Sequence, residues 1–153
     1  MKHDLTETFY VAYVGVLLNG KQNLITTGEA HGLTLMQTVT MLILAGVKEL
    51  PMSAFSELFA CDASNVTGII DGLEQKKLVA RRSNDKDRRI KMICVEPAGK
   101  AMQKKLLKTF AEVSEGTFSI LTQAERKGLK SRVFRMCNAI SKAHGDVYSS
   151  LTE

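Results

Sequence analysis

The sequence predicts a mainly α-helical protein that contains one two-stranded β-hairpin. Apolar residues recur every three or four positions through most of the chain, which is the spacing that one face of a helix needs. Only residues 78–83 and 90–95 lose this spacing and are typical of strands, and the polar run Asn84-Asp85-Lys86-Asp87 between them is typical of a turn. At 153 residues the chain is long enough to bury a single core.

Two helices are predicted in the first third of the chain. The first covers residues 4 to about 30, with Asn19-Gly20 as a place where it could bend and Gly32 as its stop. The second runs through Val47. It opens with Thr34-Leu-Met-Gln37, in which the threonine hydroxyl and the glutamine amide can each accept a hydrogen bond from the other residue's backbone N–H.

Two short helices joined by a tight turn are predicted next. The first begins at Pro51-Met-Ser53, with Ser53 as its N-cap, and ends near Ala60. Asp62 can cap the second, which runs from Ala63 to about Lys77. This pair is typical of a helix-turn-helix, and a hairpin directly after it is typical of a wing. We therefore predict a winged helix-turn-helix with residues 63–76 as the recognition helix and residues 84–89 as the wing.

Two more helices follow the hairpin and predict a dimer. Pro97 opens the first, and Leu121-Thr122-x-x-Glu125 opens the second as a capping box. The terminal helices carry apolar stripes with no obvious partner in the winged part, so a second copy would bury them; an intramolecular bundle is the alternative. We expect residues 1–31 and 98–153 to dimerise around a DNA-binding domain at 32–97, all in one continuous fold. The predicted dimer seam is Leu5, Phe9, Leu129, Val133, Met136, Ile140 and Val147.

The positive charge of the chain is concentrated in one segment. The net charge is +5, yet the stretch from Lys76 to Lys91 alone carries +6, so the rest of the chain sums to −1. Local basicity of this kind indicates contact with a polyanion rather than a generally basic surface. The eight basic residues are Lys76, Lys77, Arg81, Arg82, Lys86, Arg88, Arg89 and Lys91.

Composition and motifs argue against several other classes. No apolar stretch approaches the roughly 18 residues of a membrane span, and the N-terminus lacks the layout of a secretory signal, so we expect a cytoplasmic protein with no membrane partner. The sequence contains no Gly-x-Ser-x-Gly, P-loop or dinucleotide-binding motif that would indicate an enzyme. The scattered His3, His31 and His144 predict no metal site, and no cofactor is expected.

The three cysteines leave one alternative open. Cys61, Cys94 and Cys137 form no Cys-x-x-Cys pair, and buried hydrophobic roles are the simplest interpretation. Cys61, however, lies in the bend of the helix-turn-helix, where a helix N-terminus could favour its thiolate. A cysteine-based redox-sensing regulator on the same fold is therefore the alternative function.

The ordered motifs resemble those of the MarR family of bacterial and archaeal transcriptional regulators. They cover nearly the whole chain, and they are Gly32-Leu-Thr-x-x-Gln37, Asp62-x-Ser64-Asn65-Val-Thr67, Ile70-Asp-Gly-Leu73-Glu-x-Lys-x-Leu78-Val79-x-Arg81, Asn84-Asp85-x-Asp87-Arg88-Arg89 and Leu121-Thr-x-x-Glu125. The resemblance implies a homodimer with a recognition helix in the major groove and a wing in the minor groove of a roughly palindromic site on double-stranded DNA. Many members of the family are repressors, so we expect a repressor. It also implies release from DNA when a small aromatic or phenolic effector binds between the dimer helices and the winged domain.

The recognition helix departs from the family pattern. Gly68 and Gly72 stand where the family often has basic residues, and Lys77 replaces a usual glycine. The glycines could let the backbone approach DNA closely, or they could pack against another element. Base-edge donors then reduce to short polar side chains, among which asparagine favours adenine. The predicted DNA-contacting set is Ser53, Ser64, Asn65, Thr67, Gly68, Gln75, Arg81, Lys86, Arg88 and Arg89.

Two further sets of residues have predicted roles. Arginines at a narrow turn can reach the strongly negative minor groove, and Asp85 and Asp87 are expected to hold Arg88 or Arg89 in a fixed bidentate pair. For the effector, we expect a crevice lined by Tyr13, Leu17 and Met41 with the helix after Pro97 opposite.

Overall fold

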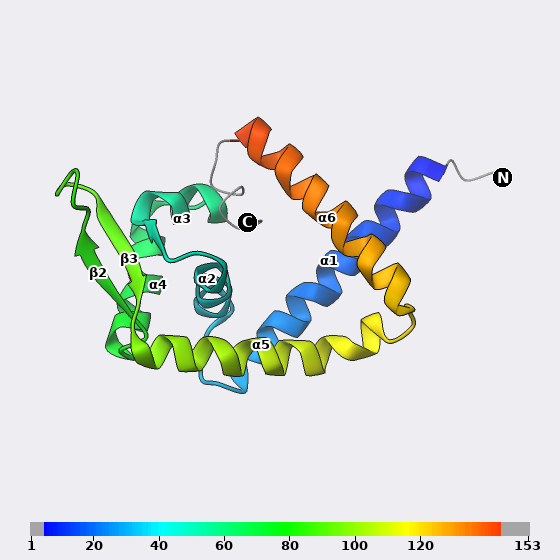
Figure 1. Ribbon diagram of the computed structural model, residues 1–153, viewed down its shortest axis with the longest axis horizontal. Helices are drawn as coiled ribbons and strands as arrows, with labels where there is room; N and C mark the ends of the chain where they lie inside the picture. The colour runs from blue at the N-terminus through cyan, green and yellow to red at the C-terminus, as the bar shows by residue number, and fades with distance from the viewer. Residues whose placement is uncertain (1–4, 145–153) are drawn as a thin grey trace.

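The structure confirms a mainly helical winged helix-turn-helix. The computed structural model describes the backbone of residues 5–144 and the side chains of residues 8–139. This part of the chain holds six helices and three strands (Figure 1). In order they are α1 (Leu5–Glu29), α2 (Leu35–Gly46), β1 (Glu49–Pro51), α3 (Met52–Phe59), α4 (Ala63–Gln75), β2 (Val79–Ser83), β3 (Lys91–Val95), α5 (Pro97–Phe118) and α6 (Gln123–His144).

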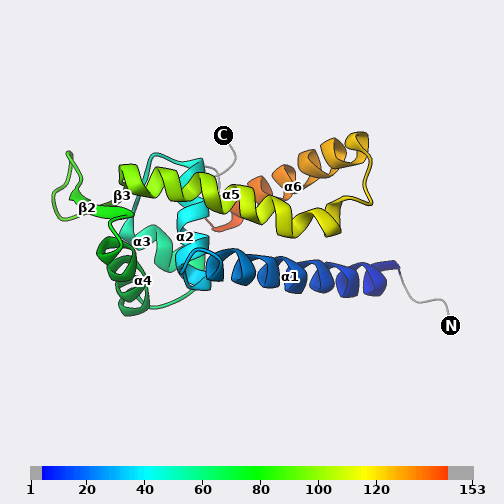
Figure 2. The same ribbon diagram turned by 90° about the horizontal axis from the view of Figure 1, so that it is seen from below.

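The C-terminal half of the long helix α1 packs against α5, and both helices contact α2 (Figure 2). Polar pairs join them: Asn23 donates to Ser114 Oγ at 3.3 Å, and His31 Nε2 lies 2.8 Å from Thr109 Oγ1. α1 continues as a helix through Asn19-Gly20. No helix in the described part of the chain is long and apolar enough to cross a membrane.

Both predicted capping boxes form. At the start of α2, Gln37 N–H donates to Thr34 Oγ1 at 3.3 Å and Thr34 N–H donates to Gln37 Oε1 at 3.2 Å. Before α6, Glu125 N–H donates to Thr122 Oγ1 and Thr122 N–H donates to a Glu125 carboxylate oxygen at 2.8 Å. A hydrogen bond from the Thr122 hydroxyl, together with that backbone bond, lowers the pKa of Glu125. The four residues of each box therefore fix where these helices begin.

The sheet has one strand more than the predicted two-stranded hairpin. β1 adds to the free edge of β3, giving the antiparallel order β1-β3-β2. Leu50 pairs with Ile93 on β3, and both side chains are buried. A strand of three residues has too little alternation to be predicted locally, since only its distant partner stabilises it.

The helix-turn-helix forms with small corrections at its caps. α3 begins at Met52 after Pro51, so Ser53 is not the N-cap and instead lies exposed in the first turn. The helix ends where predicted, because Ala60 adopts a left-handed conformation at φ 48°. Asp62 occupies the N-cap position of α4, but its side chain makes no capping hydrogen bond.

Lys77 closes α4 in a conformation that glycine usually adopts. Its φ is +57°, and its N–H donates to Glu74 O at 2.8 Å. Leu78 N–H donates to Leu73 O at 3.0 Å, which completes the six-to-one and five-to-two bonds of a Schellman motif. The replacement of glycine by Lys77 therefore keeps the motif but places a side chain in a strained backbone region.

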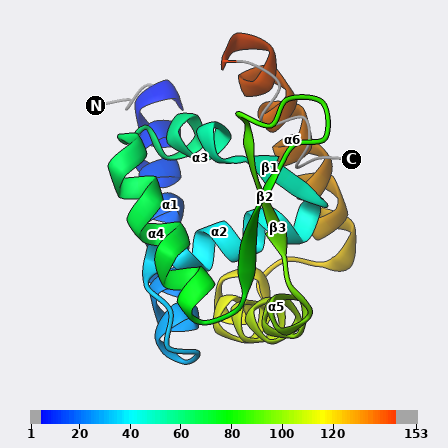
Figure 3. The ribbon, with the colours of Figure 1, turned by 90° about the vertical axis from the view of Figure 1, so that its left-hand side faces the viewer.

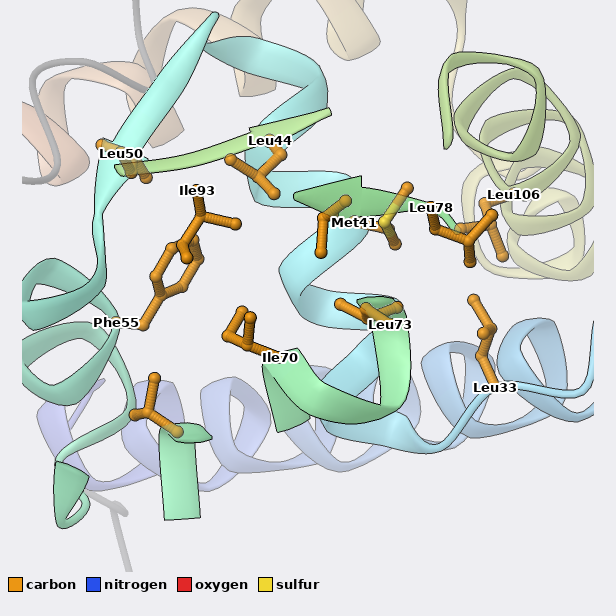
Figure 4. Packing of buried hydrophobic residues seen from close by; sticks show 12 residues of the cluster. Leu33, Met41, Leu44, Leu50, Phe55, Ile70, Leu73, Leu78, Ile93 and Leu106 are labelled. Carbon is orange, nitrogen blue, oxygen red and sulfur yellow. The ribbon is translucent and has the colours of Figure 1, made fainter. Parts of the chain in front are cut away.

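One hydrophobic core joins the winged part to α5 (Figure 4). Phe55 from α3, Ile70 from α4 and Ile93 from β3 meet with no exposed surface. Met41 and Leu44 of α2 and Leu106 of α5 complete it from the other side. Every element from α2 to α5 contributes a side chain to this core. The recognition helix and the wing are therefore anchored to the same hydrophobic core.

Candidate nucleic-acid interface

The predicted recognition helix and wing lie at the same end of the molecule. α4 and the β2–β3 hairpin lie together at the end opposite to the N-terminal part of α1 (Figure 1). Figure 3 views this end directly and shows α4 beside the hairpin. Both elements can therefore face one partner.

α4 has one buried face and one exposed polar face. Val66, Ile70 and Leu73 are fully buried. The predicted contacts Ser64, Asn65, Thr67 and Gly68 at the start of the helix, and Gln75 at its end, are exposed. The Thr67 hydroxyl donates to Ala63 O at 2.8 Å, so its oxygen remains available as an acceptor. The exposed face thus carries short polar groups and no cation.

Hydrogen bonds within the turn order the wing. Asn84 Oδ1 accepts from the backbone N–H of Lys86 at 2.8 Å and of Asp87 at 3.2 Å, and this closes an Asx turn. Asp87 holds Arg89 in the predicted bidentate pair, with Nε at 3.1 Å from Oδ1 and Nη2 at 3.0 Å from Oδ2. These bonds lower the pKa of Asp87 and raise the pKa of Arg89.

Two other wing cations point to solvent unpaired. Lys86 and Arg88 are exposed, and within residues 8–139 neither side chain has an ion-pair or hydrogen-bond partner. The same holds for Asp85, whose predicted pairing with an arginine does not occur in this structure. Asp87 alone therefore makes the orienting contact that the sequence assigned to both aspartates.

Arg81 is held inside the domain by two acidic residues of α4. Its guanidinium pairs with Glu74 and lies 2.7 Å from Asp71, and its backbone N–H donates to Glu74 Oε1 at 2.8 Å. The same group donates to Thr67 O at 3.3 Å. Arg81 was predicted to contact DNA; the structure shows its charge neutralised by the recognition helix. The sequence analysis did not predict this role, although Arg81 follows Glu74 by only seven positions, across the turn from α4 to β2.

The two glycines of α4 have different surroundings. A Cβ at Gly68 would meet open space, whereas a Cβ at Gly72 would collide with the side-chain amide of Gln37. That amide also closes the capping box of α2. Glycine at position 72 therefore leaves room for the Gln37 side chain. Glycine at position 68 leaves the helix backbone accessible at the centre of the exposed face.

The predicted effector residues do not come together in the single chain. Met41 is fully buried in the core, whereas Tyr13 and Leu17 are 40% and 52% exposed on α1. Of the predicted dimer seam, Phe9, Leu129, Val133 and Met136 are exposed. The side chains of Leu5 and Ile140, and all of Val147, lie outside the described residues, as do His3 and the side chain of His144. Among the side chains that are described, no cluster of His, Cys, Asp or Glu could hold a metal ion.

Comparison with known proteins identifies the winged part of the chain. The MarR family model matches residues 33–91, from just before α2 through the wing to the first residue of β3. These residues form a MarR-family winged helix-turn-helix, the DNA-binding domain of a class of transcriptional regulators. A search of curated protein sequences found no match.

Solved MarR-like structures share the fold over most of the chain. A MarR-family transcriptional regulator from Silicibacter pomeroyi is 24% identical, with 90% of this chain and 97% of that chain covered and a TM-score of 0.70. Bordetella bronchiseptica BpsR, studied for regulation of its DNA binding by 6-hydroxynicotinic acid, is 22% identical over 89% and 94%, with a TM-score of 0.63. A mutant of S. aureus MepR bound to an oligodeoxyribonucleotide is 20% identical over 86% and 97%, with a TM-score of 0.56.

Proposed function

We propose that this protein is a homodimeric, ligand-responsive repressor of the MarR family that binds a roughly palindromic operator. In this proposal the exposed face of α4 enters the major groove and residues 84–89 enter the minor groove. The observation that carries it is the placement of the polar α4 face and the unpaired wing cations at one end, with Arg81 fastening the two elements together. A mutant of the similar protein MepR is bound to an oligodeoxyribonucleotide, which supports this use of the fold.

The two elements would make unequal contributions to binding. The α4 face supplies Ser64, Asn65 and Thr67 but no cation, so it can read base edges while adding little electrostatic attraction. Lys86 and Arg88 supply that attraction, and phosphates from both strands concentrate negative potential in the minor groove. We therefore expect high affinity to depend on the wing and sequence preference to depend on α4.

Exposed apolar faces support the homodimer. Residues 9–18 of α1 expose Phe9, Tyr10, Val11, Tyr13, Val14, Val16, Leu17 and Leu18, each by at least 40%. α6 adds Leu129, Val133 and Met136. A monomer seldom leaves so many neighbouring large apolar side chains in water, and a second copy offers the matching surface. Two-fold symmetry would place two wings on related half-sites, which is why we propose a palindromic operator.

The proposal includes a small-molecule effector that controls DNA binding. Regulation of BpsR by 6-hydroxynicotinic acid shows that a protein of this fold can respond to a small aromatic acid. In this chain Tyr13 and Leu17 lie on the α1 face that the second copy would cover. A phenolic or aromatic effector bound there would contact both copies, and native mass spectrometry of the purified dimer would detect one that is retained.

The cysteine-based redox switch has less support. Cys61 packs against the hydrophobic core of the winged domain. For Cys94, burial and a hydrogen bond to Glu49 raise the pKa of the thiol, which disfavours the reactive thiolate. Peroxide titration with DNA binding as the readout distinguishes the two functions, because unchanged affinity after full thiol oxidation excludes the switch.

Selection of bound sequences from random duplex DNA tests the proposed function. We expect enrichment of an inverted repeat whose two halves lie about one helical turn apart. A reporter placed behind the selected site should then be repressed when the protein is expressed. Failure to enrich any sequence, with salt-insensitive retention of DNA, would contradict operator binding.

A further inference from the structure

A cavity of about 680 Å³ lies on the outer face of the small sheet, away from the interface and the helix faces described above. Its back wall is the solvent side of the sheet, where Glu49 pairs with Cys94 across β1 and β3. The end of α2 and the first three turns of α5 form its sides. Gln103 on α5 donates to Met41 O at 3.1 Å and fixes these two helices together beside the cavity.

The cavity combines apolar walls with an excess of positive charge. Val47, Val95 and Leu107 supply apolar surface. Four cations line it against two carboxylates, giving a net charge of +2; the charged residues are Lys48, Arg82, Lys100, Lys104, Glu49 and Glu96. Its volume lies within the range of about 300–1,000 Å³ of small-molecule sites. Apolar walls with a few convergent charges are the usual composition of a site for an organic ion.

The lysines on α5 are placed where they destabilise the free helix. Lys100 and Lys104 are one turn apart on one face, so their charges repel. Lys100 lies directly after the first turn of α5, which contains no acidic residue, and Glu96 occupies the N-cap position. Among the described residues neither lysine has a carboxylate partner, whereas Lys108 on the next turn has Glu112. A bound anion would relieve the repulsion between the two lysines.

We propose that this cavity binds a small organic anion with an apolar body. The anionic group lies between Lys100 and Lys104, and the body contacts Val47, Val95 and Leu107. The site is distinct from the crevice predicted at Tyr13 and Leu17, because it lies on the wing sheet and needs no second copy.

Arg82 connects this site to the wing. It projects from β2 and pairs with Glu96, the residue before α5, at 3.0 Å. An anion beside Lys100 competes with Glu96 for the Arg82 guanidinium, because both offer oxygen acceptors to the same donors. Occupancy therefore loosens the link between β2 and α5 and changes the position of the hairpin that they support. This regulatory consequence rests on the proposed function, whereas binding of the anion does not.

Fluorescence titration of the full chain tests the site without DNA. The probe is 1-anilinonaphthalene-8-sulfonate, and its matched control is N-phenyl-1-naphthylamine, which has the same rings without the sulfonate. Two variants alter the site. The double variant Lys100→Gln with Lys104→Gln removes the charges, and Ala45→Phe fills the cavity from α2. The control variant, Lys105→Gln with Lys108→Gln, removes the same charge from the same helix outside the cavity.

We expect each site lysine to contribute about fivefold to affinity for the sulfonate dye. The site variants should therefore lose tenfold or more, the control variant should match the unmodified chain, and the neutral dye should not respond to the lysine changes. Equal dye affinity in all four proteins would overturn the site. If the dye binds the cavity as expected but saturating dye leaves DNA affinity unaltered, the site stands and its coupling to the wing is overturned. If the chain without dye does not bind DNA, that result counts against the proposed function alone.

Discussion

Glu74 on α4 accepts two hydrogen bonds from Arg81 on β2, one from the backbone N–H at 2.8 Å and one from the guanidinium. Asp71 binds the same guanidinium from one turn earlier on the helix. A single arginine thus fixes the angle between the recognition helix and the wing. This explains why a helix proposed to face DNA carries two acidic residues, since their charge is used inside the domain.

Removal of this contact should weaken DNA binding without removing a phosphate contact. Glu74→Gln should cost about 1–2 kcal/mol in the free energy of unfolding, because both partners are only about a third exposed or less. DNA affinity should fall as the helix and the wing lose their fixed angle. The slope of log affinity against log salt should stay the same in Arg81→Ala. A slope reduced by about one would instead show that Arg81 neutralises a phosphate.

The wing arginines should control the salt dependence of binding. Arg88→Ala with Arg89→Ala should lower affinity for all DNA sequences and flatten the salt slope by up to about two, because each phosphate contact contributes about 0.9. Fluorescence anisotropy at several salt concentrations measures this, with Lys105→Ala on α5 as the control. An unaltered slope in the double variant would exclude the wing from the interface.

Alanine at the two glycines of α4 should have opposite effects on stability. Gly68→Ala meets open space and should raise the free energy of unfolding by about 0.5–1 kcal/mol through helix propensity. Gly72→Ala displaces the Gln37 amide and disrupts the capping box of α2, which costs about 1 kcal/mol or more. Urea unfolding of the pair should therefore separate them by about 1–2 kcal/mol, and equal stabilisation would show that Gln37 yields freely.

Glycine should be favoured at Lys77 and disfavoured at its neighbour. Lys77→Gly relieves a left-handed backbone at φ +57° and should stabilise the protein by about 0.5–1 kcal/mol. Lys76→Gly removes the same charge at φ −81°, where glycine has no advantage, and should destabilise it. If both variants changed stability in the same direction, charge rather than backbone conformation would be responsible.

A charge on the exposed face of α6 should prevent dimerisation. Val133 is 46% exposed in the single chain, and Val133→Glu would bury a carboxylate in the proposed interface. Light scattering should report a monomer, and tight operator binding should be lost with the second wing. Ser131→Glu introduces the same group two residues away and is the control. A dimeric Val133→Glu protein would exclude this seam.

The helices and the wing could be predicted from the sequence because their signals are local. Thr34 with Gln37 and Thr122 with Glu125 mark two helix starts through side chains three residues apart. Asp87 and Arg89 are two residues apart, so their pairing also follows from short-range geometry. Cap positions were less predictable: Ser53 suits an N-cap as well as any residue does, yet Pro51 takes that place because the preceding chain is already paired as β1.

Only the tertiary structure decided the contacts between distant segments. Leu50 becomes a strand residue because Ile93 lies beside it, and Met41 belongs to the core rather than to an effector crevice because α3, α4 and α5 close over α2. Lys48, Arg82 and Lys100 line one cavity although they are far apart in the chain. The sequence by itself determined the MarR-like motifs, the helix-turn-helix and the basic wing, since caps, periodicity and turns act over a few residues. The roles of Arg81 and Gly72 and the existence of the cavity follow only from tertiary packing, because the residues that they contact come from other elements.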